Sequence, residues 1–118
     1  MIARTIAAVL VCLMLAGTVI GESETGHLRP KSVNVACAQD SAQVSWEEIM
    51  DVNLTGYDIY QKAPSDPDYV KVNQGLVTAA QYIVVGLASA TFYEFAVTAV
   101  YNDGIASGLS NPASCTTG

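Results

Sequence analysis

The sequence predicts an all-β domain, a seven-stranded antiparallel sandwich that follows an N-terminal signal peptide. Three observations support this prediction. Short segments with alternating apolar and polar residues recur after residue 30, and this period of two is typical of strands buried on one face. Gly, Pro, Asn and Asp separate these segments, as they do between short antiparallel strands. No segment after residue 21 has a helical period, so we expect almost no helix in the domain.

The first 21 residues are predicted to form a secretory signal peptide. Arg4 precedes an apolar run from Ile6 to Leu15, and small residues follow this run. Cleavage is expected before Glu22. The alternative is an uncleaved anchor, because the uncharged stretch lies at the lower limit of the length that spans a bilayer. In either case we expect the folded part to be secreted, extracellular or periplasmic.

A flexible tether is expected at residues 22–29, and a single domain at residues 30–117, with Pro30 at its start. The strands of this domain are predicted in chain order at residues 32–37, 42–46, 56–62, 69–73, 81–85, 91–101 and 107–116. The second strand directs the only Trp of the chain, Trp46, inward. In the third strand Tyr57 and Ile59 are expected to face the core, because they lie two residues apart.

The later strands are recognised by the turns between them. Pro and Asp residues at 63–68 predict a turn before the short fourth strand. Gly86 closes the fifth strand, and the turn at residues 102–104 follows the sixth. Pro112 lies within the seventh strand, where it would remove a ladder hydrogen bond from a central position. We therefore expect this last strand at a sheet edge or at a bulge.

The run Leu87-Ala-Ser-Ala-Thr-Phe-Tyr-Glu-Phe-Ala-Val-Thr-Ala-Val joins a turn to the longest predicted strand. It resembles the approach to strand F of a fibronectin type III domain, with Tyr93 at the tyrosine corner of that family. Trp46 and the run Gly56-Tyr-Asp-Ile-Tyr60 add to the resemblance, which covers roughly residues 30–117. The resemblance implies an immunoglobulin-like sandwich and no catalytic activity, because this family serves mainly as a spacer or binding module.

The resemblance also implies a core and shows one departure. The expected core side chains are Trp46, Tyr57, Ile59, Leu87, Tyr93, Phe95 and Val97. Ala90 departs from the pattern, since many members of the family have Gly before the Thr-x-Tyr run. This departure raises a question about the geometry of the turn and not about the class.

Two cysteines, Cys37 and Cys115, remain once the signal peptide with Cys12 is removed, and export favours a disulfide between them. In the implied fold, the first and last strands finish at the same pole, where these cysteines would lie. Closing a loop of this length would stabilise the fold by about 4 kcal/mol in the chain-entropy model. Two free thiols are the alternative, and most members of the family lack such a pair.

The charge balance argues against nucleic acid and anionic membranes as partners. Five Lys and Arg against eleven Asp and Glu give a net charge of −6. Four against eleven, or −7, remain if Arg4 leaves with the signal peptide. Phosphate backbones and anionic lipids would be repelled by such a chain. Membrane contact is expected only if the N-terminal segment stays uncleaved.

No enzyme activity, cofactor or metal is expected. The only histidine, His27, falls in the predicted tether, so a Ser-His-acid or Cys-His site has no His within the domain. Glu47, Glu48 and Asp51 share one acidic loop and could act as paired carboxylates or bind Ca²⁺. A solvated acidic loop is the favoured interpretation. Asn53 begins a glycosylation sequon that would matter only in a glycosylating host.

The candidate binding surface consists of two loops that are expected at one pole of the sandwich, where rigid scaffolds commonly carry recognition loops. Its residues are Glu47, Glu48 and Asp51 in the first loop, and Tyr101, Asn102, Asp103, Ile105 and Leu109 in the second. For Ile105 and Leu109, packing against the rim is the simpler alternative. The second loop contains no Arg-Gly-Asp, so the integrin-binding role of the family does not carry over.

These observations predict a secreted or surface-displayed, non-catalytic module that binds an extracellular protein or a polysaccharide. One alternative is a structural subunit of a cell-surface assembly that pairs through an exposed edge strand. Another is an accessory module of an extracellular hydrolase system, which would bind polysaccharide without turning it over.

Overall fold

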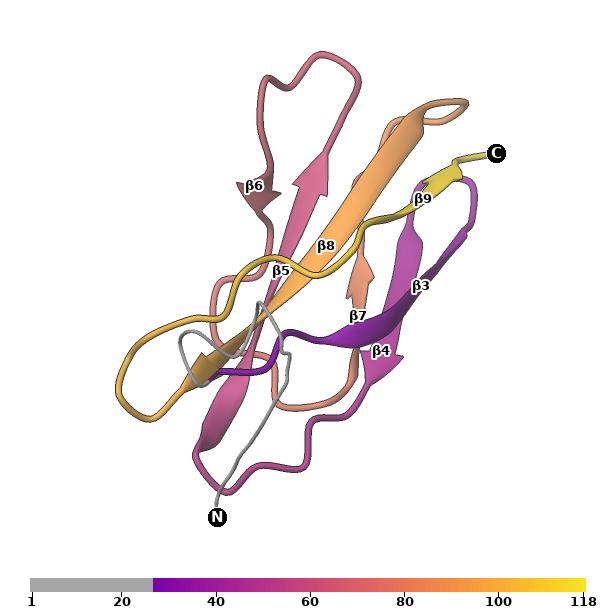
Figure 1. Ribbon diagram of the computed structural model, residues 1–118. Coiled ribbons are helices and arrows are strands. Elements are labelled where there is room, and N and C mark those ends of the chain that lie inside the picture. The colour runs from indigo at the N-terminus through magenta and orange to yellow at the C-terminus, as the bar shows by residue number, and fades with distance from the viewer. Residues whose placement is uncertain (1–26) are drawn as a thin grey trace, which may run out of the picture.

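The computed structural model describes residues 27–118 and shows two antiparallel sheets packed face to face (Figure 1). Seven strands occur in this part of the chain: β3 (Lys31–Cys37), β4 (Ala42–Glu47), β5 (Leu54–Lys62), β6 (Val70–Lys71), β7 (Gln81–Val84), β8 (Phe92–Tyr101) and β9 (Ala113–Thr116). One sheet has the order β3-β4-β7 and the other β6-β5-β8-β9. The prediction of an all-β, seven-stranded sandwich is confirmed. The predicted signal peptide and residues 22–26 of the predicted tether lie outside the described residues.

Apolar side chains of both sheets meet in one core. All seven side chains that the sequence placed there are buried, and Ala42, Val44, Val84, Ala99 and Tyr101 join them. Trp46 of β4 packs edge-on against Tyr57 of β5, with ring centroids 5.1 Å apart, so this pair joins the two sheets. No helix long and apolar enough to cross a membrane occurs in the part of the chain that the structure describes.

The turn before β8 has the geometry of a tyrosine corner. The Ala88 N–H donates to the Tyr93 hydroxyl at 3.0 Å, five residues upstream of the ring. Ala90 adopts a φ of 52°, a left-handed conformation that favours Gly because a Cβ is crowded there. Ala90 therefore occupies a strained conformation, and the bond of the tyrosine corner is still made.

The seventh strand is shorter than predicted, because only Ala113–Thr116 pair regularly with β8. Residues 107–112, which precede this strand, run beside β8, and two serine hydroxyls accept hydrogen bonds from β8 N–H groups where a regular strand would offer carbonyl groups. The hydroxyl of Ser110 accepts from the Val97 N–H at 2.9 Å, and that of Ser107 accepts from the Ala99 N–H at 3.0 Å. Both serines are buried. The ladder of β8 is therefore satisfied by side chains, which alternation along the sequence cannot reveal. β9 is an edge strand, as Pro112 led us to expect.

The predicted disulfide is confirmed. Cys37 and Cys115 are bonded, with their Cα atoms 5.8 Å apart, and 78 positions separate them in the sequence. The bond joins β3 of one sheet to β9 of the other. Figure 1 shows the C-terminal end beside the turn between β3 and β4, where the Gly118 N–H donates to the Ala38 carbonyl at 3.0 Å. We call this end of the sandwich the disulfide pole.

Candidate functional site

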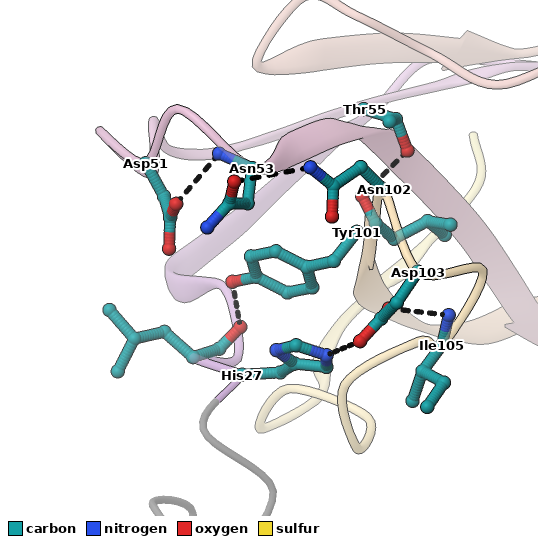
Figure 2. Close-up of polar contacts among 10 residues, drawn as sticks. His27, Asp51, Asn53, Thr55, Tyr101, Asn102, Asp103 and Ile105 are labelled. Atoms are coloured by element: carbon teal, nitrogen blue, oxygen red, sulfur yellow. Dashed lines mark hydrogen bonds and ion pairs between the residues drawn. The ribbon is translucent and has the colours of Figure 1, made fainter.

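The two candidate loops meet at the opposite end, which we call the loop pole (residues 27–30, 48–53 and 102–109). The Asn102 N–H donates to the Asn53 carbonyl at 2.8 Å, and the two side-chain amides are hydrogen-bonded at 3.1 Å. Figure 2 shows this contact, with Thr55 beside it on β5. The loops therefore support each other and present one continuous surface.

The first loop is held rigidly at its base. The Ile49 N–H donates to the buried Tyr57 hydroxyl at 2.9 Å, and Ile49 packs partly against the core. The Asp51 carboxylate accepts from the Asn53 N–H at 2.8 Å, and the Asp51 carbonyl accepts from the Leu54 N–H. This arrangement is a short turn closed by its own Asp side chain. Asp51 therefore shapes the loop.

The tip of this loop exposes two apolar side chains. Met50 is 87% exposed and Val52 is 98% exposed, the largest exposures among the large hydrophobic residues of the described chain. A hollow of about 240 Å³ on one side of Met50 is lined by Leu28, Arg29 and Lys31 together with the loop. A second hollow, of about 400 Å³, is lined by residues 48–52 and Leu54. The tip of the first loop therefore presents two apolar side chains to solvent, with a hollow on either side of Met50.

Tyr101 is not available to a partner, contrary to its predicted place in the binding surface. It is 1% exposed and belongs to the core, because the alternation of β8 continues through it. Its hydroxyl donates to the Leu28 carbonyl at 2.9 Å. Burial raises the pKa of this hydroxyl, and the nearby charge of Asp51 adds to the effect.

The last residues of the predicted tether contact the domain. The His27 ring stacks on Tyr101 with centroids 4.2 Å apart, and its Nε2 lies 2.9 Å from the Asp103 carboxylate (Figure 2). The Arg29 guanidinium donates to the Leu109 carbonyl at 3.3 Å. Residues 27–29, which fall in the predicted tether, are thus joined to the domain by ring stacking and hydrogen bonds.

The second loop contributes less exposed apolar surface than the first. The Asp103 carboxylate accepts from the Ile105 N–H at 2.9 Å. This bond, followed by the bond with His27, lowers the pKa of Asp103. Asn102 and Ile105 are exposed, whereas Leu109 is half-buried against the rim. The simpler alternative of rim packing therefore holds for Leu109 and not for Ile105, which is 53% exposed.

The described residues contain no group of three or more His, Cys, Asp and Glu side chains placed to hold a metal ion. Glu47 and Glu48 are exposed, while Asp51 is turned into its own loop. The three carboxylates that could have formed a calcium site are therefore spread around the tip. They supply negative charge to the surface that surrounds Met50 and Val52.

The fold and the loop pole define an immunoglobulin-like β-sandwich with two interacting loops at one end. A family model described as the fibronectin type III domain matches residues 28–116, and the chain belongs to this family. Members of the family are generally non-catalytic modules.

Comparisons with solved structures support the same fold. A structure titled "Myokine structure" has a TM-score of 0.67 and 25% identity, covering 78% of this chain and 98% of that chain. An Fn3-like protein from Clostridium thermocellum has a TM-score of 0.63 and 21% identity, covering 78% and 94%. A β-1,2-glucanase from Parabacteroides distasonis has a TM-score of 0.65 and 19% identity, covering 79% of this chain and 13% of that chain. None of the curated proteins compared with the chain matches it significantly.

The most exposed large hydrophobic residues of the site, Met50 and Val52, were not predicted from the sequence. The acidic residues of their loop indicate a solvated surface and do not point to an apolar tip. The signal was present, since Ile49-Met50-Asp51-Val52 places three apolar residues in an otherwise polar loop. Exposure on a rigid tip, however, depends on the bond from Ile49 to Tyr57, which joins residues eight positions apart.

Proposed function

We propose that the protein is a non-catalytic module that binds another protein through the loop pole. The observation that carries this proposal is the exposure of Met50 and Val52 on a turn held by Asp51 and Tyr57. Exposing two large apolar side chains to water costs free energy, and this free energy is regained when a partner buries them. A preformed turn also lowers the conformational entropy lost on binding.

The charge around the tip indicates the chemistry of the partner. Glu47, Glu48 and Asp51 outnumber Arg29 and Lys31 around Met50 and Val52, in a chain with a net charge of −6. A complementary surface has an apolar pocket with a rim of Lys and Arg. The apolar contact would supply most of the affinity, and the charged rim would supply specificity and association rate.

A protein fits this pole better than a polysaccharide. Sugar rings are commonly recognised by exposed aromatic faces together with polar side chains. At the loop pole Tyr57 and Tyr101 are both buried, and the exposed side chains at the tip are aliphatic. An apolar tip matches a hydrophobic pocket on a protein and offers little to hydroxyl groups.

The proposed setting is outside the cytoplasm. The Cys37–Cys115 disulfide is compatible with an oxidising compartment, in which such bonds persist. The N-terminal sequence adds to this, since it has the features of a signal peptide. Secretion or surface display would bring the loop pole into contact with extracellular proteins.

The proposal is tested by capture from the native extracellular and envelope fractions. The protein is immobilised through Gly118, which lies at the disulfide pole and leaves the loop pole free. Met50→Ser/Val52→Ser is compared with Val70→Ser/Phe92→Ser, which removes apolar groups that are 52% and 46% exposed at other sites. We expect the pole variant to lose a captured protein at least about tenfold, which corresponds to about 1.4 kcal/mol, while the control variant keeps it.

Two results of the same experiment would contradict the proposal. If both variants capture the same protein as the unchanged chain, the loop pole is not the binding site. If the chain binds an insoluble polysaccharide and no protein, the accessory role predicted as an alternative replaces this proposal. High salt should weaken capture, because the charged rim is exposed to solvent.

A further inference from the structure

The four sheet edges of the sandwich are not protected equally. β3 carries Lys31 and a register shift between Lys31 and Asn34, and its end is bonded through Cys37. β6 has only two residues, one of them Lys71. β9 follows Pro112 and carries the other half of the disulfide. Charge, irregularity, short length and proline are the usual devices that prevent edge-to-edge pairing.

β7 has none of these devices. It is regular and uncharged, and it lies at the end of the sheet order β3-β4-β7. Between Lys71 and Glu94 the chain contains no charged residue. Ile83, on the outer face of β7, is 58% exposed, and Val85, which directly follows the strand, is 73% exposed. An apolar edge of this kind is a template for a further strand.

The backbone register shows which groups this edge presents. The Trp46 N–H donates to the Ala80 carbonyl at 3.1 Å, which marks these two residues as a hydrogen-bonded pair. Bonding alternates along an antiparallel ladder, so Tyr82 and Val84 also exchange bonds with β4. The N–H and carbonyl groups of Ile83 therefore point away from β4, toward the free edge. They are the groups that an added strand would bind.

We propose that β7 pairs antiparallel with β7 of a second copy of this chain, about a two-fold axis at Ile83. In this register Ile83 lies opposite its own copy, and Gln81 lies opposite Val85. The apolar side chains of the two copies then cover each other on the outer face. A two-fold contact of this kind uses both free edges and closes the assembly at a dimer.

Charge opposes a second copy less at this edge than elsewhere on the chain. Two chains with a net charge of −6 repel each other over most of their surfaces. The uncharged segment that contains β7 is the place where two copies can approach without bringing carboxylates together. A hollow of about 280 Å³ beside the strand, lined by Val72, Tyr82 and Leu87, leaves room for the partner strand to approach.

The geometry implies a weak dimer with a defined shape. A ladder of five residues on each side, Gln81 to Val85, falls short of the roughly 1,200 Å² of total area that stable complexes bury, so association should depend on concentration. Antiparallel pairing reverses one copy relative to the other. The two loop poles would therefore face opposite directions, and one dimer could bridge two partners.

The test is sedimentation velocity of the oxidised protein from about 10 µM to about 1 mM, the range in which a small interface is populated. Ile83→Lys places an ammonium group at the centre of the ladder, where the two copies would repel each other. Val70→Lys on β6 is the matched control, because Val70 is 52% exposed on another edge strand. We expect the unchanged chain and Val70→Lys to dimerise, and Ile83→Lys to weaken dimerisation at least about tenfold.

A second measurement does not depend on a variant. Amide exchange of Ile83 should slow as the concentration rises, because its N–H becomes hydrogen-bonded in the dimer. Exchange at Tyr82, whose N–H already bonds to β4, should change less. If Ile83→Lys fails to fold, Val85→Lys and this measurement still decide the question.

Several outcomes would overturn the proposal. The chain could stay monomeric up to about 1 mM, or Val70→Lys could break the dimer while Ile83→Lys leaves it intact. Assemblies larger than a dimer would contradict closure about a two-fold axis. None of these results bears on the partner of the loop pole, because Ile83 lies outside the residues that define that pole.

Discussion

At the disulfide pole, backbone and covalent bonds close the chain upon itself, whereas at the loop pole the chain projects apolar side chains into solvent. The Thr117 hydroxyl donates to the Ala88 carbonyl, and the Thr91 N–H donates to the Thr117 hydroxyl at 2.9 Å. At the other pole, Met50 and Val52 are the most exposed large hydrophobic residues of the described chain. One end of the same sandwich is therefore built for stability, and we propose that the other is built for contact.

A buried tyrosine at the base of a loop orders the loop without burying its tip. Each pole uses a buried tyrosine whose hydroxyl accepts a backbone N–H: Tyr93 from Ala88, and Tyr57 from Ile49. At the disulfide pole the turn is additionally tied to the C-terminal residues. At the loop pole the tyrosine fixes only the base of the loop, so the tip remains ordered and exposed.

The largest effect should come from breaking the disulfide. The double variant Cys37→Ala/Cys115→Ala should lower the free energy of unfolding by about 4 kcal/mol, because a long loop is no longer closed in the unfolded chain. Strand content at room temperature should stay unchanged, since the core does not depend on the bond. Chemical denaturation and circular dichroism measure both quantities. An unchanged free energy of unfolding would show that the disulfide pole owes its stability to other contacts.

Removing one tyrosine hydroxyl at a time tests whether the two poles are stabilised independently. Tyr93→Phe and Tyr57→Phe should each lower the free energy of unfolding by about 1 kcal/mol, because each leaves a partly buried N–H without its acceptor. We expect only Tyr57→Phe to loosen residues 48–53 in amide exchange. Equal loosening of this loop by Tyr93→Phe would show that the poles do not act independently.

Relieving the strain at Ala90 should raise stability. Ala90→Gly should increase the free energy of unfolding by roughly 0.5–1 kcal/mol, because Gly adopts a positive φ without crowding. Ala88→Gly is the matched control in the same turn. Its φ is not positive, so this change should add only unfolded-state entropy and destabilise the protein. A loss of stability in both variants would contradict the strain at Ala90.

Removing the exposed tip should cost little stability. Met50→Ser/Val52→Ser should change the free energy of unfolding by less than about 0.5 kcal/mol, because both side chains are already in solvent. Thermal unfolding beside the capture experiment tests this directly. A large loss of stability would mean that the tip packs against the domain and is not reserved for a partner.

The smallest expected effect is a change in the pH dependence of stability when Asp103 is replaced. The bonds from the Ile105 N–H and from His27 lower the pKa of Asp103 below its ordinary value, so its contribution to stability is present above the unfolded-state pKa and is lost as pH falls through the folded-state pKa. Asp103→Asn should therefore be less stable than the unchanged chain near neutral pH, with the difference vanishing in strong acid. Unfolding measured as a function of pH tests this. A difference that is constant across the series would remove the ionised carboxylate as its cause.

Local pattern accounts for the parts of the fold that were predicted. The core positions of Phe95 and Val97, which the family resemblance implied, agree with alternation along β8, because successive side chains of a strand face opposite sides. Alternation failed for residues 107–112, where Ser107 and Ser110 replace regular pairing with hydroxyl acceptors. Continued to Tyr101, the same alternation predicts a buried side chain, so the predicted binding surface began one residue too early.

Alternation and turn residues sufficed to predict an all-β domain. The core and the shared pole of the two loops came from the resemblance to the fibronectin type III pattern, and the two cysteines predicted a disulfide with free thiols as the alternative. Contacts between distant segments decided that His27 stacks on Tyr101, that Met50 and Val52 form the exposed tip, and that β7 lies at an unprotected edge. The physical reason is that exposure and edge position are set by contacts between segments far apart in the chain, which no local pattern contains.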